Sequence, residues 1–150
     1  MRFALLAAFA AVCLGAPAHA QTACPPAAYD SARLQAIKTN DWAVPNDRER
    51  NRLARALTAC LSSPDPALRD GVAFEALAHW LRARQLSVET MRALAADMDA
   101  RLSAEDPTGV ARPFAALVLS EAVRADRVET YLDADTRAQL LDRAIAYFVD

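Results

Sequence analysis

Residues 65–81, DPALRDGVAFEALAHWL, decide the fold of this chain. The Asp65 side chain suits a helix N-cap, and Pro66 suits the first helical position, where a missing N–H costs nothing. Two mainly apolar stripes then follow the helical period: Leu68, Val72, Ala76 and His79 fall on one, and Phe74, Leu77 and Leu81 on the other. Because a helix that is apolar on more than one stripe normally packs between neighbours, this stretch predicts a central helix buried on most sides.

Proline and capping residues divide the chain on either side of this helix into further helices. The predicted helix starts are Pro26, Asn46, Pro66, Ser87, Pro113 and Asp133. The first helix is expected over about residues 27–39. Alternate starts lie 40–47 residues apart, a period typical of two-helix HEAT or armadillo units. The predicted fold class is therefore all-α, as a short right-handed α-solenoid of three helix pairs, with an irregular six-helix bundle as the alternative.

Residues 1–20 have the pattern of a cleavable signal peptide. Arg2 supplies the positive start, residues 3–14 the apolar run, and Ala18-His19-Ala20 the small-residue cleavage site. This run is shorter than the roughly 20 residues that span a bilayer. We expect a soluble periplasmic or secreted protein, one helical domain over residues 21–150 and no stable membrane insertion after cleavage. An uncleaved N-terminal anchor is the alternative.

Composition argues against several classes of function. The chain has 17 basic and 19 acidic residues, and its arginines are scattered, whereas a nucleic-acid binder needs a basic face. Beyond the leader only Gly71 and Gly109 remain, so there is no glycine-rich phosphate loop of the nucleotide-binding kind. We predict no cofactor and no nucleic-acid partner.

Two cysteines remain after the leader, Cys24 and Cys60. Thiol pairs persist as disulfides in the oxidising compartments outside the cytoplasm. Cys24 precedes the first predicted helix and Cys60 lies near the end of the second, and these ends are neighbours in an antiparallel hairpin. A disulfide worth about 3–4 kcal/mol is therefore predicted. The alternative is two buried, reduced cysteines.

Glu75 and His79 are the first pair of polar residues that could form a site. They lie four residues apart, so they share one face of the central helix. Such a pair could be half of a metal site or an acid–base pair, but zinc needs three or four ligands and no second histidine follows the leader. A hydrogen-bonded pair at the edge of the core is the simpler interpretation.

Asp70 and Glu121 are the second pair, because each falls on an apolar stripe. A carboxylate in such a place must be paired or neutralised. The two could form a catalytic acid–base pair, or each could bind an arginine. The arginines considered are Arg69, Arg112 and Arg124. No nucleophile or ligand set accompanies them, so we predict no catalytic, cofactor or metal residue.

Two blocks of the chain resemble an uncharacterised bacterial family, domain of unknown function 2785. They are SPDPALRDGVAFEALAHWLR at 63–82 and EDPTGVARPFAALVLSEAVRADRVETYL at 105–132. The resemblance implies a helical protein, with a leader and paired cysteines in exported members, and it implies no activity. Family members continue into a second helical half with a histidine-containing block, so the resemblance also implies that this chain is the N-terminal part of a longer domain.

Two functions follow from these patterns. The first is a non-catalytic exported scaffold that binds protein or peptide on the surface of stacked helix pairs. The alternative is the N-terminal half of an enzyme, perhaps hydrolytic, whose active site lies in an absent C-terminal half. A complete scaffold is expected to bury the apolar side of the last helix, and a half-enzyme to expose it. The residues concerned are Leu140, Leu141, Ile145 and Phe148.

Overall fold

The computed structural model describes residues 23–149, so the predicted signal peptide lies outside the described residues. No strand occurs between residues 23 and 149, and the predicted all-α class is confirmed. The elements are α1 (Ser31–Thr39), α2 (Asp47–Leu57), η1 (Thr58–Ser62), α3 (Pro66–Leu68), η2 (Arg69–Phe74), α4 (Glu75–Arg82), α5 (Val88–Leu102), α6 (Ala111–Val128) and α7 (Ala134–Val149).

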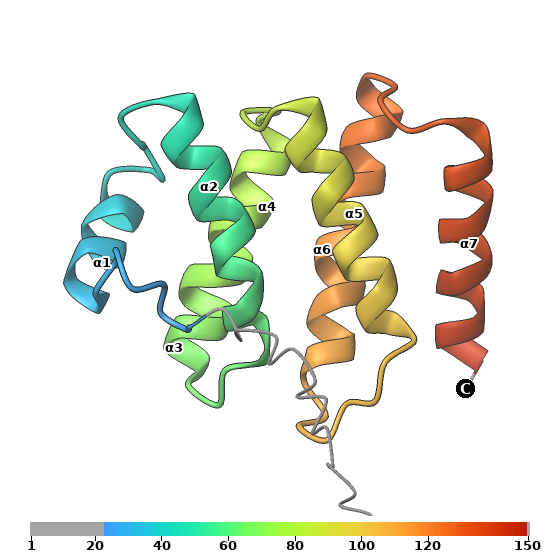
Figure 1. Ribbon diagram of the computed structural model, residues 1–150, viewed down its shortest axis with the longest axis horizontal. Coiled ribbons are helices and arrows are strands. Elements are labelled where there is room, and N and C mark those ends of the chain that lie inside the picture. Colours follow the sequence, from blue (N-terminus) through green and yellow to red (C-terminus); the bar gives the residue numbers. More distant parts are fainter. Residues whose placement is uncertain (1–22, 150) are drawn as a thin grey trace, which may run out of the picture.

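These helices are arranged in a row that is two layers deep (Figure 1). In one layer α5 packs against α2 on one side and α7 on the other, and in the second layer α4 packs against α6. The closest packing between layers is that of α5 on α6. Both predicted architectures, the right-handed solenoid of three helix pairs and the irregular six-helix bundle, stay predictions.

The central helix forms as predicted, but it is not α-helical throughout. α3, η2 and α4 follow one another without a break from residue 66 to residue 82, and η2 is a π-helical stretch. Asp65 caps the start by accepting a hydrogen bond from the N–H of Ala67 at 2.9 Å. Trp80 and Leu81 are fully buried, as expected for a helix enclosed by its neighbours.

Three of the predicted helix starts are confirmed by their caps. The side chains of Asn46, Ser87 and Asp133 each accept a hydrogen bond from the backbone N–H three residues later, at 2.8–3.2 Å. Each bond satisfies a donor that the first turn of a helix leaves without a partner.

The predicted start of the first helix at Pro26 is wrong. α1 begins at Ser31, because Asp30 provides the cap by accepting a hydrogen bond from the N–H of Arg33 at 2.8 Å. The carbonyl of Pro26 instead accepts a hydrogen bond from the N–H of Tyr29 in a turn. The helix expected at Pro113 begins slightly earlier, at Ala111.

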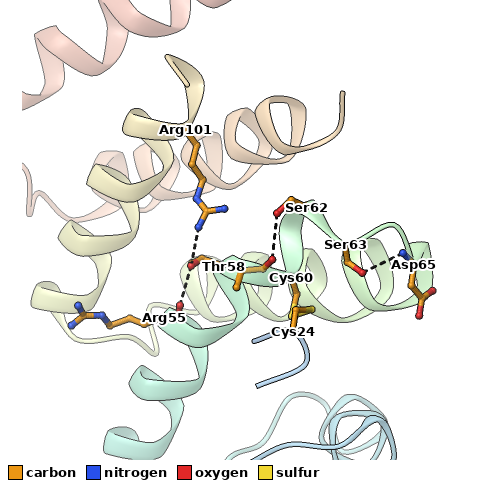
Figure 2. Close-up of a disulfide and its surroundings, with 9 residues drawn as sticks. Cys24, Arg55, Thr58, Cys60, Ser62, Ser63, Asp65 and Arg101 are labelled. Atoms are coloured by element: carbon orange, nitrogen blue, oxygen red, sulfur yellow. Dashed lines mark hydrogen bonds between the residues drawn. A yellow bond between two sulfur atoms is a disulfide. The ribbon is translucent and has the colours of Figure 1, made fainter. Parts of the chain in front are cut away.

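The predicted disulfide between Cys24 and Cys60 is present (Figure 2). The Cα atoms lie 5.1 Å apart, and the bond ties the segment before α1 to η1. Cys60 is fully buried. Close by, the Thr58 hydroxyl accepts a hydrogen bond from Arg101 of α5 at 3.4 Å, so this region also contacts the middle of the row.

Helix α7 bears on the two expectations for the last apolar face. Leu140 is 5 % exposed, but Leu141 is 61 % exposed, Ile145 53 % and Phe148 81 %. The exposure of these last three side chains is the outcome expected of a half-enzyme and not of a complete scaffold. It arises because α7 packs on α5 with the side that carries Leu140. Of the helices within residues 23–149, none is long and apolar enough to cross a membrane.

Candidate functional site

The predicted polar candidates do not converge on one site. Glu75 and His79 lie one turn apart on α4, Asp70 lies in η2, and Glu121 lies on α6. Each carboxylate has a basic partner, and the partners come from different parts of the chain.

Glu75 binds a lysine of the first helix. The ammonium of Lys38 lies 2.8 Å from Oε2 of Glu75 and donates a hydrogen bond to the carbonyl of Gly71 at 2.7 Å. Lys38 is the only lysine in the sequence. It therefore joins α1 to the central helix at the π-helical stretch, and Glu75 belongs to this contact rather than to a hydrogen bond with His79.

His79 lies beside a shallow surface hollow. Its Nδ1 is 4.0 Å from Oδ1 of Asp41, which is too long for a hydrogen bond. Asp41 and Trp42 have φ values of 51° and 59°, so this turn is left-handed at two consecutive residues. The hollow measures about 480 Å³ and is lined by Trp42, Phe74, Glu75, Ala78, His79, Arg82 and Ala83. It offers one imidazole and no serine, threonine or cysteine nucleophile.

Glu121 is held by an arginine of the neighbouring helix. Nε of Arg82 donates to Oε2 at 2.8 Å, a second bond joins the same two side chains, and Arg124 lies 3.9 Å away. The hydrogen bonds from Arg82 lower the pKa of Glu121 and outweigh burial, which would raise it. Glu121 therefore stays ionised at neutral pH. It links α4 to α6 and is not available as a general acid.

Asp70 binds its chain neighbour Arg69. Nε of Arg69 donates to Oδ1 at 2.6 Å, as the sequence predicted among its alternatives. The same guanidinium lies 5.1 Å above the ring centre of Phe114 on α6. Asp70 and Glu121 thus bind different arginines and do not form an acid–base pair.

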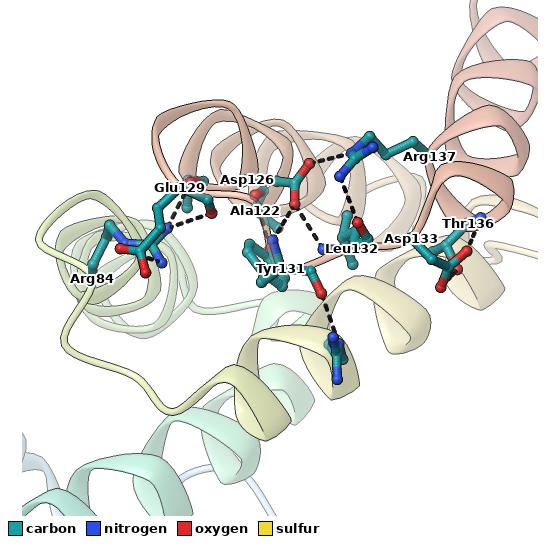
Figure 3. A network of polar contacts seen from close by, with 11 residues as sticks. Arg84, Ala122, Asp126, Glu129, Tyr131, Leu132, Asp133, Thr136 and Arg137 are labelled. Atoms are coloured by element: carbon teal, nitrogen blue, oxygen red, sulfur yellow. Dashed lines mark hydrogen bonds and ion pairs between the residues drawn. The ribbon is translucent and has the colours of Figure 1, made fainter.

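Asp126, near the end of α6, was not among the predicted candidates, yet it lies at the centre of a buried polar network (Figure 3). It is 3 % exposed. Its Oδ1 accepts hydrogen bonds from the N–H groups of Tyr131 and Leu132, both at 2.7 Å, and Oδ2 accepts one from Arg137 at 2.6 Å. One carboxylate thereby holds the α6–α7 loop and the first turns of α7.

The electrostatics of this network are set by burial and by hydrogen bonds that oppose it. Burial acts to raise the pKa of Asp126, but the hydrogen bonds from Leu132, Tyr131 and Arg137 outweigh it and lower that pKa. Burial, aided by the charge of Asp126, raises the pKa of Tyr131 to about 12. The sequence does carry a signal for this role, because an acidic residue in the last turns of a helix opposes the helix dipole and needs a local reason to be there.

A groove between α6 and α7 has a mainly apolar lining. It measures about 430 Å³. We call it the α6–α7 groove, and it is lined by Leu102, Ala116, Leu119, Ser120, Val123, Arg124, Asp126, Arg127, Arg137, Leu140, Leu141, Ala144, Tyr147 and Phe148. The sequence analysis identified the apolar side of α7 but not the groove, whose other wall comes from α6.

Comparison with known proteins adds no function to this geometry. No protein-family model, no curated protein and no solved structure matches the chain. The resemblance to domain of unknown function 2785 therefore stays a prediction. Within residues 23–149, no group of three or more histidine, cysteine or acidic side chains is placed to hold a metal ion.

Proposed function

We propose that this chain is an exported, disulfide-bonded helical module that binds a protein or peptide and does not itself catalyse a reaction. The observation that carries the proposal is the α6–α7 groove with the exposed apolar side chains of α7 around it. Contiguous exposed apolar surface on a soluble protein usually marks an interaction site. Leu141, Ile145 and Phe148 contribute to such a surface here, since each is more than half exposed.

The contacts of the polar candidate residues also support a function without catalysis. Lys38, Arg69 and Arg82 bind the carboxylates of Glu75, Asp70 and Glu121. The hydrogen bonds from Arg82 lower the pKa of Glu121, so this carboxylate is a poor proton donor. These ion pairs have a structural role, and the proposed binding function requires no catalytic role for them.

Export rests on two features that agree. Residues 1–20 have the pattern of a cleavable signal peptide, and the Cys24–Cys60 bond is of a kind that persists in oxidising compartments. These two features support our proposal that the protein acts in the periplasm or outside the cell.

Site-specific photo-cross-linking in the exporting cell tests the binding function. A photoreactive amino acid at position 141 is expected to give a discrete cross-linked protein. The same amino acid at position 88 is the control, because Val88 is 43 % exposed on α5 and is not part of the groove. Absence of adducts from position 141, with export and folding intact, would contradict the proposal.

The alternative function is the N-terminal half of an enzyme. The exposed face of α7 is the outcome expected of this alternative, whereas a complete scaffold was expected to bury it. In that case the groove would be covered by further chain of the same protein. The coding sequence downstream of Asp150 distinguishes the two, because only the enzyme hypothesis requires it to continue into a second helical half.

A further inference from the structure

We propose that the α6–α7 groove binds one amphipathic α-helix of a partner protein, with acidic residues along the edge of that helix that faces α6. This inference rests on the proposed binding function and names the chemistry of the partner. It is carried by the shape of the groove, by the apolar rows that line it and by the charge of its rim.

The shape of the groove is that of a missing helix in the row. α6 packs against α4 and α5, whereas its remaining flank faces the groove. α7 packs on α5, so the two walls of the groove are held apart by the helix between them. A helix seated there would contact α6 on the flank opposite α4, and would continue the layer that α4 and α6 form.

The apolar residues that line the groove are spaced along α6 and α7 so that a third helix can pack against them. Along α6 the lining presents Ala116, Leu119 and Val123, and along α7 Leu140, Ala144 and Phe148. Both rows follow the three-to-four-residue spacing of one helix face. The α7 wall runs from Arg137 to Phe148, about 17 Å at 1.5 Å per residue, which matches about three turns of a partner helix.

The rim supplies the charge preference. Arg124 and Arg127 line the groove from α6. Arg127 makes no ion pair within residues 23–149, and Arg124 approaches Glu121 only to 3.9 Å. The acidic residue of the lining, Asp126, is buried and already bound to Arg137. The edge on α6 is therefore positive, and acidic side chains on the partner complement it.

A second copy of this chain is the competing occupant. Its helix α7 carries Asp135 and Asp142 on one edge, seven residues apart, and its two arginines, Arg137 and Arg143, already bind Asp126 and Asp99. In a second copy, however, Leu141 and Phe148 already line the groove of their own chain, so the same side chains would have to form one groove and fill another. A helix from a different protein has no such conflict, and the two sources are separated by the sedimentation experiment below.

Synthetic helices test the proposal on the full exported chain, purified with its disulfide intact. The probes are labelled peptides of about three to four turns with leucines along one face and with either glutamates or lysines along the edges. Fluorescence anisotropy is expected to show that the glutamate peptide binds at least about tenfold more tightly than the lysine peptide. Equal affinities for the two peptides, or no binding of either, would overturn the acidic-helix proposal.

Matched variants locate the binding. Leu141→Glu is expected to weaken the binding of the glutamate peptide at least about tenfold. Arg127→Glu is expected to reverse the preference, so that the lysine peptide binds more tightly. Val88→Glu and Arg48→Glu are the controls, since both positions are exposed and lie outside the groove. Retention of the glutamate preference in Arg127→Glu, or equal losses in Leu141→Glu and Val88→Glu, would overturn the assignment to this groove.

Sedimentation without peptide tests the competing occupant. Concentration-dependent dimers that disappear in Leu141→Glu would make the groove an interface between copies and overturn the proposal. The cross-linking at position 141 separates the two levels of inference. A cross-linked partner without any preference between peptides would leave the binding function standing and remove only its acidic-helix chemistry.

Discussion

The region around the disulfide and helix α7 are built in opposite ways. Around the disulfide, Leu57, Cys60 and Leu61 are fully buried, and η1 packs on both α2 and η2. Helix α7, in contrast, has one buried residue, Leu140, in 16 residues. The first region has the burial of a core, whereas the second leaves most of an apolar helix face exposed.

Helix α7 is held by polar contacts in addition to the packing of Leu140. Asp126 binds Arg137 in the first turns of α7, and Asp99 of α5 binds Arg143 further along at 3.1 Å. Arg92 of α5 also donates to the carbonyl of Tyr131 at 2.8 Å. A helix fixed in this way can keep its apolar side free for binding, because its position does not depend on burying that side.

The largest loss of stability is expected from Trp80→Ala in the disulfide half. Trp80 is fully buried, donates from Nε1 to the carbonyl of Trp42 at 3.0 Å and packs edge-on against the Trp42 ring. Truncation leaves a large cavity and should lower the free energy of unfolding by about 3–5 kcal/mol. Denaturant unfolding followed by circular dichroism measures it, and a loss below about 1 kcal/mol would show that this half is not the stable core.

Removal of the disulfide should lower the free energy of unfolding by nearly as much as Trp80→Ala. Cys24 and Cys60 are 36 residues apart, and closing a loop of that size is worth about 3–4 kcal/mol in the chain-entropy model. The comparison is between the oxidised protein and the Cys24→Ser, Cys60→Ser double variant, unfolded in denaturant. Equal midpoints for the two would contradict the prediction.

Asp126→Asn should show a smaller, pH-dependent loss at the α7 end. Loss of the charged hydrogen bonds from two backbone amides and Arg137 is expected to cost about 1.5–3 kcal/mol at neutral pH. The folded-state pKa of Asp126 lies below its ordinary value of 3.8. Its contribution is therefore complete above that value and is lost as pH falls through the lower, folded-state pKa.

The measurement for Asp126→Asn is the unfolding free energy as a function of pH. The difference between wild type and variant should be constant near neutrality and shrink below about pH 4. Asp30→Asn is a suitable comparison, because Asp30 is exposed and caps α1 by accepting a hydrogen bond from the N–H of Arg33, and asparagine is an equally good capping residue. A difference for Asp126→Asn that grows toward acid pH would contradict the assignment.

The sequence predicted most of the fold because its signals are local. A capping side chain and the N–H that it binds are three residues apart, as at Asn46, Ser87 and Asp133, so a helix start can be predicted from a short stretch of sequence. The apolar stripes of the central helix likewise predict its burial. Pro26 misled because a proline marks either a helix start or a turn, and Asp30 four residues later is the stronger cap.

The contacts that position the candidate site were not predictable in the same way. Arg82 and Glu121 are 39 residues apart, and Lys38 reaches Gly71 over 33. Partners at such separations depend on how helices pack, which a local pattern does not specify. The same holds for the α6–α7 groove, because one wall can be inferred from the apolar side of α7 but the other depends on where α6 lies.

The smallest effect on stability is expected from Leu141→Ala, and the adjacent Leu140→Ala is its matched control. Leu140 is 5 % exposed, and its truncation should lower the free energy of unfolding by about 2 kcal/mol or more. Leu141 is 61 % exposed, and its truncation should lower that free energy by no more than about 0.5 kcal/mol. The two variants remove the same atoms from neighbouring positions of one helix, so their difference in unfolding midpoint isolates burial. If Leu141→Ala destabilised the protein as much as Leu140→Ala, the outer side of α7 would already be covered within this chain, and it would no longer be a free surface for a partner helix.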